Sequence, residues 1–83
     1  MLVDIVAVRP LGAHRLWLQF EDGVAGEIDL APLLQFDGVF APLLDAAEFA
    51  RVQVDAERGT IRWPGGADVA PDTLYEQVKN GIR

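Results

Sequence analysis

The chain has 83 residues, a net charge of −6 and no cysteine. This length predicts one small domain over residues 1–83, and the absence of cysteine excludes disulfide scaffolds and thiolate metal sites. No apolar run is long enough to cross a bilayer, and the first residues lack the basic segment of a secretory signal. We therefore expect a cytoplasmic protein without a membrane partner.

The first 30 residues predict three strands of an antiparallel meander. Residues 2–9 carry Val and Ile on both faces, which is typical of a well-covered strand. Residues 14–20 and 24–30 alternate between apolar and polar side chains, which is typical of strands with one buried face. The loop between these two strands ends at Gly23, which suits the left-handed position of a hairpin bulge. We therefore expect consecutive strands to pair.

Trp17 lies on the polar face of the second strand, opposite Leu16, Leu18 and Phe20. If helices cover both faces of the sheet, Trp17 is a core residue. If they cover one face, it is an exposed aromatic side chain of the kind that anchors protein interfaces. We favour core packing and keep Trp17 as a candidate for partner binding.

The middle of the chain predicts short helical turns over one face of the sheet. Residues 31–34 form one turn that begins near Pro32. Asp45 and Glu48 have the spacing of a capping box at the start of another helical segment. Between the turn at residues 31–34 and this second segment lies an apolar stripe at helical spacing, made of Val39, Phe40, Leu43 and Leu44.

The second half of the chain predicts a hairpin and a final helix. Residues 51–55 and 60–63 have strand character, and the loop between them ends in glycine. Pro64-Gly65-Gly66 then form the corner between the last strand and a helix over residues 71–80, because Pro71 suits a first helical turn. The helix buries Leu74, Val78 and Ile82, while Trp63 and Tyr75 pack in the core around the corner.

These elements predict an α+β fold: an antiparallel sheet of about five strands (a three-stranded meander, then a hairpin), with short helices over one face and a C-terminal helix.

The sets of side chains that known catalytic sites use are nearly absent. One histidine, no cysteine and no serine make a Ser-His-Asp or Cys-His unit impossible within one chain. We predict no catalytic residues, no cofactor, no metal and no enzyme activity.

Asp68, Asp72 and Glu76 are spaced four residues apart, which on one continuous helix would give a row of hard-cation ligands. A metal-dependent enzyme that uses these carboxylates is therefore one alternative function. However, Pro71 places Asp68 before the helix and breaks the row. We favour structural roles, in which Asp68 caps the turn and Asp72 complements the helix dipole.

The stretch between Leu16 and Ala50 contains seven acidic residues and no Lys or Arg. Such a field repels the nucleic-acid backbone, so we expect no direct nucleic-acid binding by this domain, and it favours a basic protein partner. A strand edge or Trp17 would also serve a homo-oligomer. Five residues are candidates for partner binding: Trp17, Glu27, Asp29, Asp68 and Asp72.

Four segments together resemble the short bacterial proteins of domain-of-unknown-function family twenty-four forty-two. They are Phe20-Glu21-Asp22-Gly23, Asp29-Leu30-Ala31-Pro32-Leu33-Leu34, Val39-Phe40-x-Pro42-Leu43, and Ile61-x-Trp63-Pro64-x-Gly66-x-Asp68-x-Ala70-Pro71-Asp72-x-Leu74-Tyr75-Glu76. The match spans nearly the whole chain and is most specific at its C-terminal end. Gly65 stands where the family commonly has Asn, and Val69 where it often has Leu.

The resemblance implies a small α+β domain with no established activity and no catalytic residues to transfer. Some relatives carry an added helix-turn-helix domain, and family genes often lie beside another small uncharacterised protein, as in toxin–antitoxin pairs. Our main hypothesis is a non-enzymatic interaction module that is the acidic member of such a pair. The alternative is a regulatory domain of a DNA-associated protein that lacks its helix-turn-helix module.

Overall fold

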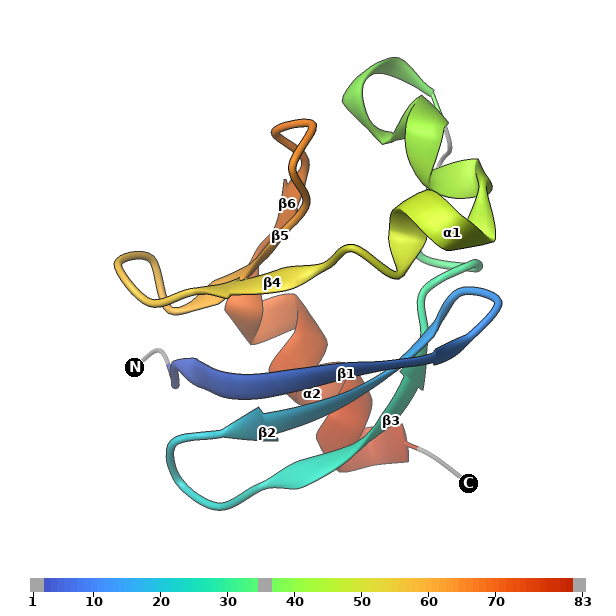
Figure 1. The fold of residues 1–83 in the computed structure, drawn as a ribbon. Helices are drawn as coiled ribbons and strands as arrows, with labels where there is room; N and C mark the ends of the chain where they lie inside the picture. Colours follow the sequence, from blue (N-terminus) through green and yellow to red (C-terminus); the bar gives the residue numbers. More distant parts are fainter. Residues whose placement is uncertain (1–2, 35–36, 82–83) are drawn as a thin grey trace.

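A computed structural model describes residues 3–34 and 37–81 and shows an α+β fold (Figure 1). This part of the chain forms two three-stranded antiparallel sheets. The first contains β1 (Ile5–Gly12), β2 (Arg15–Phe20) and β3 (Ala25–Asp29), and the second contains β4 (Gln53–Asp55), β5 (Thr60–Arg62) and β6 (Asp68–Val69). The helical elements are the 3₁₀ helix η1 (Gly38–Leu44), α1 (Ala46–Phe49) and α2 (Pro71–Gly81).

The first sheet is the predicted meander, with its strands in the order β1-β2-β3. Across the loop between β2 and β3, the Phe20 amide donates to the Val24 carbonyl oxygen at 2.8 Å. Gly23 takes a φ of +94°, the left-handed conformation that the sequence predicts there. Leu16 and Leu18 are fully buried, so the alternation along β2 identifies the inner face correctly.

The prediction that the first strand is covered on both faces is wrong. The pairing of β1 with β2 shifts between Ile5 and Ala7, and such a bulge interrupts the alternation of side chains. Ile5 is 2% exposed, whereas Val6 is 53% exposed. The strand also continues past Pro10, because an edge strand tolerates a residue without an N–H. Leu2, which the sequence places in this strand, lies outside the described residues.

The prediction of a single sheet of about five strands is wrong. The six described strands form two sheets, and β1 meets the second one through the Ile5 amide, which donates to the Gly59 carbonyl oxygen at 2.9 Å. No ladder continues from this bond between the described strands. A bulge interrupts the regular course of β1 directly after Ile5, where the contact with the second sheet ends.

The corner at Pro64-Gly65-Gly66 is a hairpin turn and does not lead directly into the last helix. The Gly66 amide donates to Trp63 O, and the Trp63 amide donates to Ala67 O, both at 2.9 Å. Gly66 has a φ of +102°, which a residue with a side chain rarely adopts. The chain therefore adds β6 to the second sheet before Pro71 begins α2.

α2 lies across the inner face of the first sheet and packs mainly on β3 (Figure 1). Its predicted stripe is confirmed at Leu74 and Val78, which are buried, while Ile82 lies outside the described residues. A Cβ atom at Gly26 of β3 would lie 3.1 Å from Cγ1 of Val78, so the glycine lets the helix approach the strand closely. Within the described ranges, no helix has the length and apolar character needed to cross a membrane.

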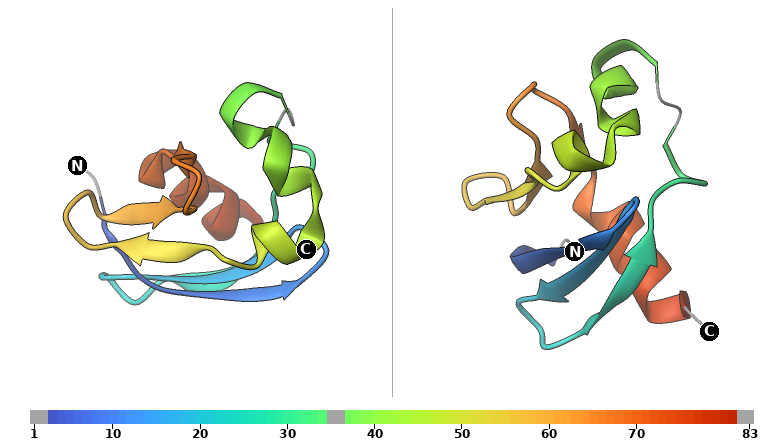
Figure 2. Two further views of the ribbon diagram at one scale, coloured as in Figure 1. Left: turned by 45° about the horizontal axis from the view of Figure 1, so that its top comes forward. Right: turned by 45° about the vertical axis from the view of Figure 1, so that its right-hand side comes forward.

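The short helices do not lie over a sheet face as predicted. η1 and α1 form a separate lobe beside the turn between β1 and β2 (Figure 2), and we refer to residues 37–50 as the helical lobe. Asp45 caps α1 as predicted, because its Oδ1 accepts a hydrogen bond from the Ala47 amide at 2.9 Å. Glu48 does not complete the capping box: its carboxylate lies 3.3 Å from Arg51 Nη1.

One hydrophobic cluster joins both sheets, α2 and the helical lobe. Trp63 is buried in it as predicted. Tyr75 is half-buried and packs edge-on against Phe20, with ring centroids 5.0 Å apart. Its hydroxyl donates to Asp22 Oδ2 at 2.6 Å and so ties α2 to the loop between β2 and β3.

The Tyr75 hydrogen bond makes stability depend on pH at both ends of the range. This bond, assisted by the Val24 amide, lowers the pKa of Asp22, and Asp22 in turn raises the pKa of Tyr75. The stabilisation from Asp22 is present above the unfolded pKa of about 4 and is lost as the pH falls through the lower folded pKa. The stabilisation from Tyr75 is present below about pH 10 and is lost as the pH rises through its raised pKa.

We expect the Tyr75→Phe variant to return the pKa of Asp22 toward its usual value, because the ring contact remains and only the hydroxyl donor is removed. An NMR titration of the Asp22 carboxyl carbon in both proteins measures this change. An Asp22 pKa that is equal in both proteins would contradict the role of the Tyr75 hydroxyl.

Candidate partner-binding surface

Trp17 lies on β2, the central strand of the first sheet, on the face opposite the buried Leu16 and Leu18. This outer face of the sheet is turned away from α2 (Figures 1 and 2). In the strand register it pairs with Arg9 of β1 and Glu27 of β3. The side chain is half-buried, so the structure places it outside the core that the sequence favoured. We call this surface the Trp17 face, and it comprises Ala7, Arg9, Arg15, Trp17, Gln19, Ala25, Glu27 and Asp29.

Charged side chains surround Trp17 in the sheet, and Arg9 contacts its ring. The Arg9 guanidinium carbon lies 5.6 Å from the ring centroid, a cation–π contact that contributes about 0.5–1 kcal/mol at exposed sites. Arg15 Nη2 and Glu27 Oε1 are 2.5 Å apart, but both side chains are more than half exposed. Solvent screening therefore limits this ion pair to about 1 kcal/mol or less. An aromatic ring that is already ordered loses little freedom on binding, which favours its use as an anchor.

Three of the five predicted partner-binding residues lie together on the Trp17 face. Besides Trp17 itself, these are Glu27 and Asp29, which are exposed on the edge strand β3. Asp29 also accepts a hydrogen bond from the Ala31 amide at 3.0 Å, so one of its oxygens fixes the chain as it leaves the strand. The alternation of residues in β2 and β3 was sufficient to group these three side chains.

The other two predicted residues lie elsewhere, and the acidic row is broken as the sequence suggested. Asp68 belongs to β6, where its Oδ2 lies 3.2 Å from Arg58 Nη1, so its predicted role as a cap is wrong. Asp72 does lie in the first turn of α2, where a carboxylate complements the helix dipole. In the described part of the chain, no three His, Asp or Glu side chains gather as a possible metal site.

The helical lobe forms a second surface that the sequence did not predict, and His14 helps to hold it in place. His14 Nε2 lies 2.8 Å from Leu43 O, and this nitrogen must carry the proton because a carbonyl oxygen only accepts. The His14 ring also packs edge-on against Phe49 at a centroid distance of 5.0 Å. The sequence does not reveal these contacts of His14, because its partners are 29 and 35 positions away in the chain.

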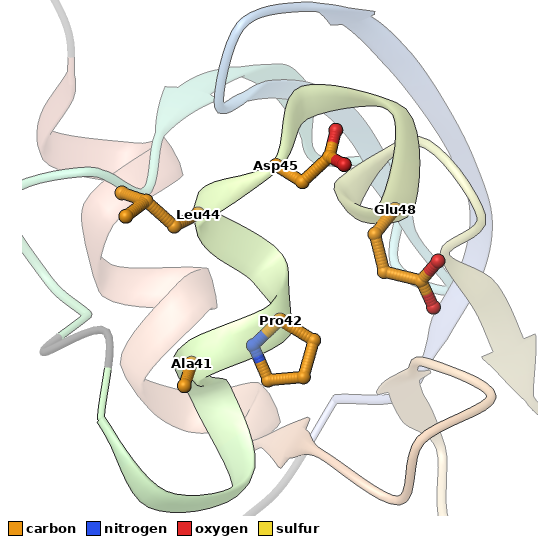
Figure 3. Close-up of a pocket in the computed structure, with 5 residues that line it drawn as sticks. All are labelled: Ala41, Pro42, Leu44, Asp45 and Glu48. Carbon is orange, nitrogen blue, oxygen red and sulfur yellow. The ribbon is translucent and has the colours of Figure 1, made fainter.

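The outer side of the lobe carries an open pocket of about 550 Å³ (Figure 3). The Pro42 ring and the carboxylates of Asp45 and Glu48 border the same space (Figure 3). Ala41 and Leu44 complete the lining. The pocket therefore combines apolar surface with two acidic groups.

The predicted stripe on this segment is only half correct. Leu43 is buried, but Val39 and Leu44 are 50% and 63% exposed. A 3₁₀ helix has three residues per turn, so Phe40 and Leu43 share one side while Val39 and Leu44 lie on others. Pro42, which cannot donate a backbone hydrogen bond, was the one sequence signal against a regular α-helix here.

Comparison with known families supports the resemblance seen in the sequence. The model of a family described as "Protein of unknown function (DUF2442)" matches residues 5–80. The chain belongs to the DUF2442 family. The matched range begins with β1 and ends within α2, so both the Trp17 face and the helical lobe belong to the DUF2442 region. Searches of the curated proteins and of the solved structures found no match.

Proposed function

We propose that this DUF2442 chain is a non-enzymatic protein-interaction module of the bacterial cytoplasm, and the acidic member of a two-gene pair of the toxin–antitoxin type. The position of Trp17 supports this best, because no element of the described chain covers the sheet face on which it lies. A central aromatic side chain within a rim of charged groups is the usual anatomy of a protein interface.

The charge distribution supports a basic partner. The net charge is −6, and the stretch between Leu16 and Ala50 has no Lys or Arg. A field of one sign attracts an oppositely charged partner over a distance and raises its association rate. Glu27 and Asp29 bring two of these carboxylates to the edge of the Trp17 face.

The histidine and hydroxyl side chains described below make structural hydrogen bonds, which supports a non-enzymatic role. His14 holds the helical lobe through Leu43. The Thr60 hydroxyl donates to the Val69 carbonyl oxygen, and the Tyr75 hydroxyl donates to Asp22. Each group therefore contributes to the fold through a defined hydrogen bond.

We expect the product of the adjacent gene to copurify with this chain and the Trp17→Ala variant to weaken their complex about 30-fold or more. Loss of a central aromatic anchor typically costs at least about 2 kcal/mol of binding free energy. Isothermal titration calorimetry on the purified pair measures the dissociation constant. The control is Gln77→Ala, an exposed position on α2 and away from the Trp17 face, where we expect less than a twofold change.

Two results would contradict this proposal. One is the absence of a complex with the adjacent gene product at micromolar concentration. The other is a Trp17→Ala variant that binds as tightly as the unmodified chain. Duplex DNA serves as a comparison ligand: binding at low salt that weakens steeply with added salt would favour the DNA-associated regulatory domain instead.

A further inference from the structure

The helical lobe presents a fixed surface that is separate from the Trp17 face. Leu43 and Phe49 anchor it in the core, and the Trp63 indole N–H donates to Phe49 O at 2.7 Å. His14 adds its hydrogen bond to Leu43 O. These contacts fix the inner side of the lobe, so a ligand on the outer side would meet a preformed pocket.

The outer side of the lobe has apolar surface that the fold leaves uncovered. Val39 and Leu44 are at least half exposed, and the Pro42 ring faces the pocket (Figure 3). These three residues lie within six positions of one short helix. Leu44 and Pro42 line the same pocket, and apolar side chains that share an exposed surface are typical of a site that another molecule covers.

Two carboxylates beside this apolar surface favour a positively charged ligand. Asp45 is exposed and uses one oxygen to cap α1. Glu48 lies 3.3 Å from Arg51 Nη1, but the Arg51 side chain is 61% exposed, and solvent screening keeps such a pair weak. A guanidinium group from another chain can therefore compete with Arg51 for Glu48.

We propose that this pocket binds a short segment of a partner protein in which an apolar residue stands beside Arg or Lys. The aliphatic stem of the basic residue packs on the Pro42 ring while its charged head lies between Asp45 and Glu48. The apolar residue covers Leu44. The open pocket has a volume of about 550 Å³, which leaves room for these two side chains. This site is independent of the Trp17 face.

The proposal is tested by NMR titration of the full chain, labelled with ¹⁵N, with the blocked peptide Gly-Arg-Leu-Arg-Gly. We expect saturable shifts at the amides of residues 41 and 43–48. Replacing both Arg residues of the peptide with Glu, or its Leu with Gly, should weaken binding at least fivefold. The Trp17→Ala variant should bind this peptide as the unmodified chain does, so the assay is independent of the partner on the Trp17 face.

The decisive variant is Asp45→Asn with Glu48→Gln, which removes both charges while Asn keeps the cap of α1. We expect it to bind the peptide at least fivefold more weakly. The matched control, Glu57→Gln with Glu76→Gln, changes the net charge equally at exposed sites outside the lobe and should bind normally. Equal weakening by both pairs would mean long-range attraction alone and would overturn the proposal. The absence of shifts at millimolar peptide would also overturn the proposal. Shifts in the lobe that depend on protein concentration without peptide would overturn it too, because they would indicate that a second copy of the chain covers the pocket.

Discussion

Replacing Trp63 with alanine is expected to lower the free energy of unfolding by about 3–5 kcal/mol. Trp63 is 1% exposed and is the largest fully buried side chain among the described residues. Its ring lies 5.4 Å from that of Phe49, and its indole N–H donates to Phe49 O at 2.7 Å. The change therefore removes packing and the shorter of the two hydrogen bonds that Phe49 O accepts, the other coming from the Val52 amide at 3.3 Å. A domain of this size has about 5–15 kcal/mol of stability in total, so the variant approaches unfolding at room temperature.

Trp63→Phe separates the hydrogen bond from the packing. Phenylalanine retains an aromatic ring next to Phe49 but cannot donate to Phe49 O, so we expect a loss of about 1–3 kcal/mol. Urea unfolding followed by far-UV circular dichroism gives both values, and Leu11→Ala, at an exposed position, provides the baseline. If Trp63→Ala costs less than about 1 kcal/mol, the indole does not join α1 to the second sheet as described.

The alternation of apolar and polar residues correctly predicted the buried face of the first sheet where the strands pair regularly. The same alternation gave a wrong prediction where a bulge interrupts the pairing. The inner face of β2 follows directly from Leu16, Leu18 and Phe20, because side chains of a strand alternate between two faces. In β1 the bulge after Ile5 adds one residue and exposes Val6. A bulge depends on the partner strand, so the sequence of β1 alone does not reveal it.

The corner after Trp63 shows a similar limit. Pro64, Gly65 and Gly66 correctly predicted a tight turn. Whether the chain then pairs back depends on distant contacts, and β6 is only two residues long. Pairing of Val69 with Ile61, and the bond from the Thr60 hydroxyl to Val69 O, complete the sheet. A strand of two residues is too short to show an alternating pattern, so the sequence does not reveal these contacts.

The candidate surfaces were predictable to different degrees. Alternation placed Trp17, Glu27 and Asp29 on one face, but whether that face is covered depends on where α2 packs. The pocket on the helical lobe was not predictable from a period of 3.6 residues, because η1 is a 3₁₀ helix. The same difference gives opposite expectations for two adjacent leucines.

We expect Leu43→Ala to lower the free energy of unfolding by about 2–5 kcal/mol and Leu44→Ala to change it by less than about 0.5 kcal/mol. Leu43 is 2% exposed and its carbonyl oxygen accepts the hydrogen bond from His14, whereas Leu44 is 63% exposed. The two variants have identical composition and nearly identical helix propensity, so their difference reports burial alone. Urea unfolding of both variants measures it. Similar losses would mean that η1 buries both leucines, as an α-helical stripe would, and that the pocket on the helical lobe is closed. A selective loss at Leu43 would leave Leu44 available to a partner.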